Sequence, residues 1–315
     1  MGMKKTKRGL SPRFMKNLKE NGELHSLLLA VLNDDTICME IRENYINIYY
    51  RGGNLCKISE SGDHYIYHFD SNYALDKEVR ESLLDFANFD CEMWLRSFPL
   101  LKSIMDSWFN KYPKEEREIQ QHIVRENNFS VIAGDTDYFI VDLEYTSSES
   151  EGRFDMIAIK WQSTSQGRKN RRDKQLVLIE VKYGDKAMGD KSGIAQHFGD
   201  WTQFVSDKAR WNSFCNEMLK VFNQKVELGL IKGLPGAIES VSYMHPEMLF
   251  LLANHKPARK KFHNELNAIL NDDSKAFQDT DVYIASSSMM GYGLYASEMI
   301  PVPEYLKGQR KIYDK

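Results

Sequence analysis

Two carboxylates and a lysine stand at the ends of two apolar runs in the second half of the chain. Asp155 lies near the start of the run 153–161, whereas Glu180 and Lys182 close the run 175–182. Side chains alternate across a strand, so Glu180 and Lys182 share a face that is apolar until its end. Charged side chains are rarely buried without a partner or an ion. If the two runs form a hairpin, antiparallel pairing brings Asp155 and Glu180 together.

Such a trio is suited to metal-assisted chemistry on a phosphate. Neighbouring carboxylates repel each other unless a cation lies between them. Mg²⁺ prefers oxygen ligands and keeps several waters, so one or two protein carboxylates suffice. The ion would lower the pKa of a water, and Lys182 would orient that water or neutralise developing charge. The alternative is a structural cluster, with Glu180 and Lys182 as a surface ion pair and Asp155 capping a turn.

The elements around these residues predict an α/β fold. The apolar patterns predict, in order, a helix over 114–127, strands over 138–145, 153–161 and 176–182, a helical region over 193–226, a strand over 248–252, a helix over 258–270 and a strand over 281–285. The first six elements run α-β-β-β-α-β, which is typical of a mixed sheet covered by helices. Ligands collect outside the carboxyl ends of strands in such sheets, which is where Glu180 lies.

With Asp155 on one strand and Glu180-Val-Lys182 on the next, residues 113–300 resemble the PD-(D/E)xK, or restriction-endonuclease-like, nuclease superfamily. Phe154 stands where the motif name has proline, a departure common within the superfamily. The resemblance implies a mixed-sheet αβββαβ core over 113–315 and a metal-dependent nuclease acting on DNA ahead of RNA. It assigns Asp155 and Glu180 as metal ligands and catalytic residues, Lys182 as the catalytic lysine, and Mg²⁺ as the cofactor, with Mn²⁺ as a substitute.

The resemblance also suggests secondary site residues. Many members add an acid from the helix before the first strand, and of the three candidates Glu115, Glu116 and Glu118 we favour Glu118, because it lies beside the Ile119/Ile123 stripe. Some branches carry a glutamine on the helix after the third strand, which would be Gln196. Glu144 could also lean into the site. For each of these residues a solvated surface is the alternative. The superfamily also contains non-catalytic binding or scaffold proteins, and its double-strand cutters often work as homodimers.

A basic segment, 163–174, joins the two strands that carry the motif. It holds Arg168, Lys169, Arg171 and Arg172, and Lys186 and Lys191 follow the second strand. Lysine and arginine bind phosphate through charge without reading sequence, so these six residues are the candidate nucleic-acid contacts. The alternative is a solvated hairpin tip.

Residues 1–112 lie outside the resemblance and are expected to form a separate α+β module of unknown role. The patterns predict a helix over 11–34, an antiparallel meander over 36–70 and helix over 74–111, broken near Pro99. Gly52-Gly53-Asn54 is a plausible hairpin turn within the meander. A protein-interaction or dimerisation surface is one role that this module could have.

The composition narrows the class of protein. The 315 residues carry a formal net charge of −3, so the overall charge does not indicate nucleic-acid binding. The four cysteines form no C-x-x-C pair, which argues against a zinc site and favours reduced thiols in a cytoplasm. No apolar run is long enough to span a bilayer, and no apolar signal core follows the basic start, so we expect neither membrane insertion nor secretion. Neither a phosphate-binding loop nor a serine-hydrolase elbow is present.

Overall fold

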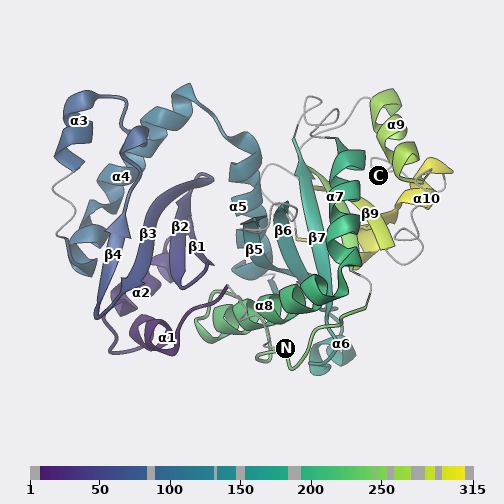
Figure 1. The fold of residues 1–315 in the computed structure, drawn as a ribbon, viewed down its shortest axis with the longest axis horizontal. Coiled ribbons are helices and arrows are strands. Elements are labelled where there is room, and N and C mark those ends of the chain that lie inside the picture. The colour runs from purple at the N-terminus through teal and green to yellow at the C-terminus, as the bar shows by residue number, and fades with distance from the viewer. Residues whose placement is uncertain are drawn as a thin grey trace.

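The computed structural model describes residues 8–83, 89–130, 133–146, 153–183, 193–244, 246–253, 259–270, 281–287 and 293–308. These residues form a mixed α/β fold with two sheets flanked by helices (Figure 1). One sheet has four strands in the order β1-β2-β3-β4, and the other has six in the order β10-β9-β8-β7-β6-β5. The expected fold class is therefore confirmed at the level of a mixed α/β protein. None of the helices in these ranges is long and apolar enough to cross a membrane.

The first sheet is the antiparallel meander expected from the sequence. Its strands are β1 (Ile37–Ile41), β2 (Tyr45–Tyr50), β3 (Gly53–Ser61) and β4 (His64–His68). Arg51 and Gly52 connect β2 to β3 with φ values of 49° and 72°, which suits a primed hairpin turn. A Cβ at Gly52 would come within 2.5 Å of the Arg117 Cβ, so the turn also needs glycine for its close approach to the next helix.

The helices of the N-terminal part differ from the prediction in two places. They are α1 (Pro12–Leu18), α2 (His25–Asn33), α3 (Lys77–Ser82) and α4 (Cys91–Lys111). The single helix expected over 11–34 is interrupted near Asn21, whose φ is 65°. The break expected near Pro99 is wrong, because Pro99 lies inside α4. Phe98 and Leu101, on either side of Pro99, are buried. Their packing stabilises the helix by more than it loses through the one backbone hydrogen bond that proline cannot donate.

The second sheet follows the predicted order of elements. Its strands and surrounding helices are α5 (Glu115–Asn128), β5 (Tyr138–Thr146), β6 (Arg153–Lys160), α6 (Ser165–Lys169), β7 (Gln175–Lys182), α7 (Ile194–Ser206), α8 (Lys208–Glu227), β8 (Glu247–Ala253), α9 (Arg259–Leu270), β9 (Asp281–Ser287), β10 (Ile300–Pro301) and α10 (Val302–Leu306). Strands β5, β6 and β7 pair antiparallel, and β7, β8 and β9 pair parallel. Parallel neighbours need a crossover, which α7 and α8 supply between β7 and β8.

Helices cover both faces of this sheet. Ile119, Ile123 and Val124 of α5 share an apolar cluster with Val177 and Ile179 of β7. The alternate side chains of β7 join α7 and α8 in a second cluster, which includes Leu176, Leu178, Phe198, Trp201, Phe214 and Met218. A strand covered on both sides becomes apolar on both faces, as the sequence of β7 indicates.

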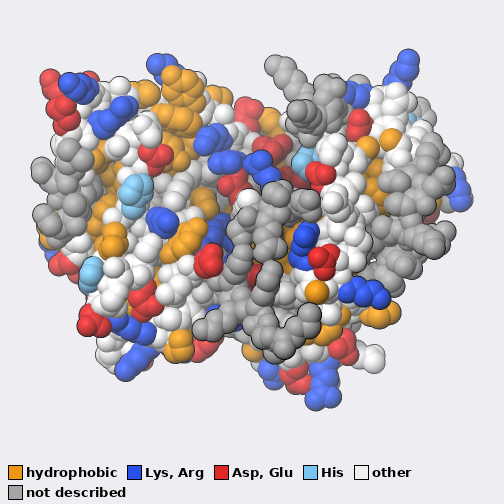
Figure 2. Space-filling model, viewed as in Figure 1, with side chains coloured by type: hydrophobic (Ala, Val, Ile, Leu, Met, Phe, Trp, Pro, Cys, Tyr) orange, Lys and Arg blue, Asp and Glu red, His pale blue; other side chains and the backbone are white. Residues whose placement is uncertain are grey.

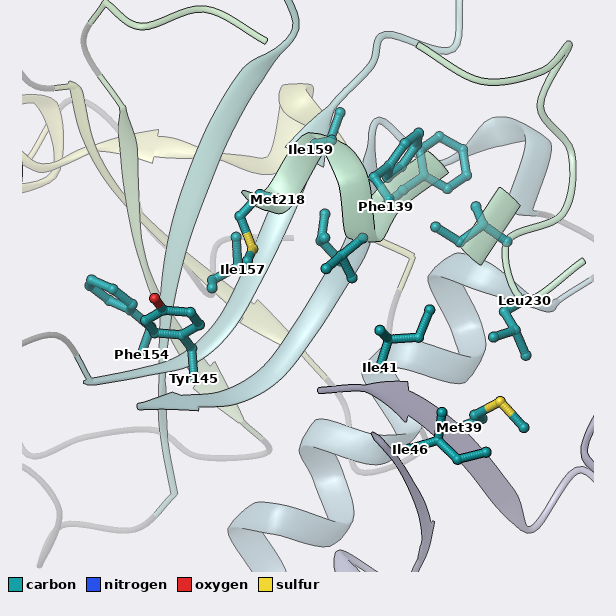
Figure 3. Close-up of a cluster of buried hydrophobic side chains, with 14 of the residues drawn as sticks. Met39, Ile41, Ile46, Phe139, Tyr145, Phe154, Ile157, Ile159, Met218 and Leu230 are labelled. Atoms are coloured by element: carbon teal, nitrogen blue, oxygen red, sulfur yellow. The ribbon is translucent and has the colours of Figure 1, made fainter. Parts of the chain in front are cut away.

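One apolar cluster runs through both sheets. In Figure 3, Met39, Ile41 and Ile46 of the first sheet lie in the same cluster as Phe139 of β5 and Leu230 beyond α8. The boundary expected at 112/113 therefore separates two sheets that share a core. The division into two domains stays a prediction.

Buried ion pairs cross the same boundary. Lys225 of α8 donates to both oxygens of Glu40 on β1 at 2.8 Å, and the side chains of both residues are at most 1% exposed. Arg42, which follows β1, pairs with Asp142 of β5 and donates to the Leu143 carbonyl at 2.7 Å. Burial raises the pKa of Glu40, and the Lys225 charge opposes that rise.

Candidate functional site

Asp155, Glu180 and Lys182 meet where β7 ends and β6 begins. Met156 is paired with Ile179 in the β6–β7 register, which sets Asp155 beside Glu180. Asp155 Oδ2 accepts a hydrogen bond from the Val181 N–H at 2.9 Å, and Lys182 Nζ donates to Glu180 Oε1 at 2.7 Å. The Glu180 and Lys182 side chains are only 5% and 4% exposed. The pair is thus buried, and Asp155 contacts the neighbouring strand and does not cap a turn.

A third carboxylate, Glu116, reaches this cluster from the first turn of α5. Its Oε2 accepts from the Tyr183 N–H at 3.3 Å. Burial raises the pKa of Glu116, and the Asp155 charge raises it further, so the two carboxylates lie close enough to repel.

Glu118, the favoured acid on this helix, points elsewhere. Its Oε1 accepts from Arg51 Nε of the β2–β3 turn at 3.1 Å. Glu116 lies three residues before Ile119 and seven before Ile123, so it shares their face of the helix. Glu118 is preferred from the sequence because it is adjacent to Ile119. Adjacent residues on a helix of 3.6 residues per turn point about 100° apart, so adjacency does not place Glu118 on the face of Ile119.

The carboxylates of the cluster have raised pKa values. Burial, and then the Asp155 charge, raise the pKa of Glu180 to about 8, although Lys182 opposes the rise. Burial is also the largest cause of the raised pKa of Asp155, and Glu144 adds to it. Lys182, Arg117 and Arg153 carry positive charge near these carboxylates, yet the three pKa values remain raised, so a further cation would stabilise the charged carboxylates.

The donor set fits Mg²⁺ by its chemistry. The three carboxylates offer the hard oxygen ligands that Mg²⁺ prefers, and the ion keeps waters in its remaining positions. Asp155 and Glu180 would hold it, with Glu116 as a further oxygen donor. Within the described ranges, no three His, Cys, Asp or Glu side chains already surround a common metal position.

His197 of α7 contacts the site, whereas the predicted Gln196 does not. His197 Nε2 lies 3.0 Å from Glu180 Oε1, and burial followed by the Lys182 charge lowers the pKa of His197 to about 4. The exposed Gln196 donates to Asp200 on its own helix at 2.8 Å. His197 lies three residues after buried Ile194 and four before buried Trp201. This spacing places His197 on the same face of α7 as those residues, and it is the sequence signal that favours His197 over Gln196.

Glu144 borders the site from β5. It lies opposite Asp155 in the β5–β6 register and has φ 49°, an uncommon backbone conformation for glutamate. Its Oε1 pairs with Arg117 Nε of α5 at 2.5 Å. Strained backbone is concentrated at functional sites, so this position supports a role for the cluster beyond packing.

The basic segment 163–174 lies away from the carboxylates, contrary to the prediction. It joins the end of β6 to the start of β7, whereas Asp155 starts β6 and Glu180 ends β7. Gln175 and Glu180 are five residues apart, which is roughly 17 Å along a strand. In Figure 1, α6, which is part of segment 163–174, marks the end of the sheet that lies away from the carboxylates.

All three arginines in this segment have protein partners. Arg168 donates to the Gly134 carbonyl at 3.0 Å, Arg171 to the Ala237 carbonyl at 2.5 Å and Arg172 to Glu239 at 2.6 Å. Lys169 is exposed at the end of α6. Lys186 and Lys191 lie outside the described residues.

No protein-family model, curated protein or solved structure matches the chain. The interpretation of the site therefore depends on the geometry and charge of these residues.

Proposed function

We propose that the chain is a metal-dependent nuclease that hydrolyses phosphodiester bonds, in DNA ahead of RNA, within a restriction-endonuclease-like core. The observation that supports this most is the meeting of half-buried Asp155 with buried Glu180 and Lys182 at the carboxyl end of β7. The element order α5-β5-β6-β7-α7-α8-β8 supports the same core.

Each side chain of the site would have a separate role in the reaction. A Mg²⁺ or Mn²⁺ ion held by Asp155 and Glu180 would supply a water of lowered pKa and neutralise charge on the scissile phosphate. Lys182 donates to Glu180 Oε1 and thereby positions that carboxylate, and its ammonium charge would stabilise the negative charge that develops on the phosphate. His197 contacts the same Glu180 oxygen from α7, so two groups fix the direction of that carboxylate.

A non-catalytic binding or scaffold protein is the second candidate function. Lys182 and His197 both contact Glu180 Oε1, so this carboxylate already has protein partners without a metal. Metal binding separates the two candidates, because a scaffold does not need it.

The test is cleavage of a mixed panel of DNA and RNA substrates with Mg²⁺ or Mn²⁺, with EDTA and an Asp155→Ala variant beside the wild type. Metal-dependent cutting that disappears in the variant supports the proposal. Absence of cutting, together with absence of metal binding by calorimetry, would favour the scaffold.

Two glutamates on α5 give a prediction and its control. We expect Glu116→Gln to lower the cleavage rate by about 10- to 100-fold, as loss of a group that supports metal ligands does. Glu118→Gln should leave the rate within about twofold, because Glu118 pairs with Arg51 on the partly exposed surface. Single-turnover kinetics measure both rates. Equal losses in the two variants would contradict the assignment of Glu116.

A further inference from the structure

Aromatic and basic side chains form a patch where α4 ends and α5 begins. We call Trp108, Lys111, Tyr112 and Lys114 the α4–α5 patch. Tyr112 is 46% exposed, and its ring centroid lies 5.1 Å from that of Trp108. Lys111 Nζ lies 5.4 Å from the Tyr112 ring, and Lys114 Nζ lies 5.2 Å from the Trp108 ring. The patch therefore joins an exposed aromatic surface to two cations.

The patch has a rigid base. Trp108 packs edge-on against Tyr73 and Phe109, with both centroid distances at 5.3 Å. The Tyr112 N–H donates to the Trp108 carbonyl at 2.8 Å and thereby fixes the end of α4. A large ring held in place at the surface loses little conformational entropy when a flat ligand stacks on it.

The α4–α5 patch is continuous with the candidate site. Lys114 is the N-cap residue of α5, and Glu116 of the site follows within the first turn. Arg117 then pairs with Glu144, which lies opposite Asp155 in the sheet register. Figure 2 shows hydrophobic side chains over the carboxyl end of α4 and Lys or Arg side chains beside them, over the start of α5.

The two lysines are suited to an anionic ligand. No carboxylate of the described residues forms an ion pair with Lys111 or Lys114, whereas nearby Arg51 pairs with both Asp106 and Glu118. Burial and the Arg117 charge lower the pKa of Lys114, whereas the Glu144 and Asp70 charges oppose that fall, so a bound anion would add to the stabilisation of the Lys114 charge.

We propose that the α4–α5 patch binds single-stranded nucleic acid, with a base stacked on Tyr112 and backbone phosphates at Lys111 and Lys114, and leads that strand to the carboxylates. Stacked aromatic rings beside cations are the features that single-strand binders combine. A paired duplex does not offer an unstacked base to an exposed ring. The inference rests on the proposed function in that it takes nucleic acid as the substrate.

Binding of labelled oligonucleotides by the full chain in EDTA tests this inference without cleavage. We expect single-stranded oligothymidylate (DNA) or oligouridylate (RNA) to bind more tightly than a duplex of equal length. Tyr112→Ala should weaken that binding by roughly 5- to 100-fold, the effect of one lost base stack. Tyr112→Phe keeps the ring and should stay within about twofold of the wild type.

The salt dependence of binding tests the two lysines of the patch separately from Tyr112. The double variant Lys111→Gln/Lys114→Gln should lower the slope of log affinity against log salt concentration by about 1.4, because each phosphate contact on a single strand contributes about 0.7. The control is Lys19→Gln, which removes an exposed cation that pairs with Glu227 outside the patch and should leave the slope unchanged. Melting curves of all variants confirm that they are folded.

Equal affinity for single strand and duplex, or unchanged binding by Tyr112→Ala, would overturn the inference. Its failure is separable from failure of the proposed function. Cleavage that depends on Asp155 but not on Tyr112 would retain the nuclease and reject the patch. Binding that depends on Tyr112, in a chain that cuts nothing with either metal, would retain the patch and reject the nuclease.

Discussion

Asp155→Asn is expected to slow metal-dependent cleavage strongly while leaving the metal-free chain at least as stable as the wild type. Asparagine has the shape of aspartate and keeps an oxygen that can accept from the Val181 N–H, so the junction of β6 and β7 remains intact. The substitution removes one of the crowded negative charges, and Asp155 is the charge that most raises the pKa of Glu180. Loss of a charged ligand should lower the cleavage rate by about 100-fold to 10,000-fold.

Thermal melts with and without Mg²⁺ provide a readout besides activity. A ligand that binds only the folded state at about 100 times its Kd stabilises that state by about 2.7 kcal/mol. The melting temperature of the wild type should therefore rise with Mg²⁺, and that of Asp155→Asn should not. Glu239→Gln is the matched control, because Glu239 is exposed and pairs with Arg172 at the far end of the sheet. Cleavage by Asp155→Asn at the rate of the wild type would contradict the site.

The elements of the second sheet could be predicted from the sequence because burial determines their patterns. Strand β7 is apolar on both faces until Glu180, so both its extent and the unusual charge at its end are visible in the sequence. The pairing of Asp155 with Glu180 then follows from antiparallel geometry alone. The same geometry, applied to the basic segment 163–174, places that segment at the opposite end of the two strands.

Helix rotation explains the two misplaced secondary residues. Successive residues on a helix differ by about 100° in direction, so Gln196 and His197 point to different surroundings. Buried Ile194 and Trp201 define the face of α7 that points toward the sheet, and His197 lies on that face. The spacing of buried residues therefore predicts which residue faces Glu180 better than the side-chain type does. The contact between Glu40 and Lys225 has no local signal, because 185 residues separate them.

Lys225→Met is expected to destabilise the chain by about 3–5 kcal/mol, the usual cost of leaving a buried charge without its partner. Among the described residues, the cation left in an ion pair with Glu40 would be the Arg42 guanidinium, 4.0 Å away and already paired with Asp142. Its pKa, already raised by burial, would rise further, and uptake of a proton would limit the loss. Urea unfolding followed by fluorescence measures the free energy of unfolding.

Two comparisons isolate the ion pair itself. Glu40→Met/Lys225→Met should recover much of the lost stability, because apolar side chains of similar size can replace a buried pair at little cost. Lys19→Met removes the exposed partner of Glu227 and should change stability by less than about 1 kcal/mol. Glu40 belongs to β1 and Lys225 to α8, which packs on the sheet that carries the candidate site. Loss of the pair should therefore shift a single unfolding transition of both sheets, and a shift confined to one of two transitions would contradict a shared core.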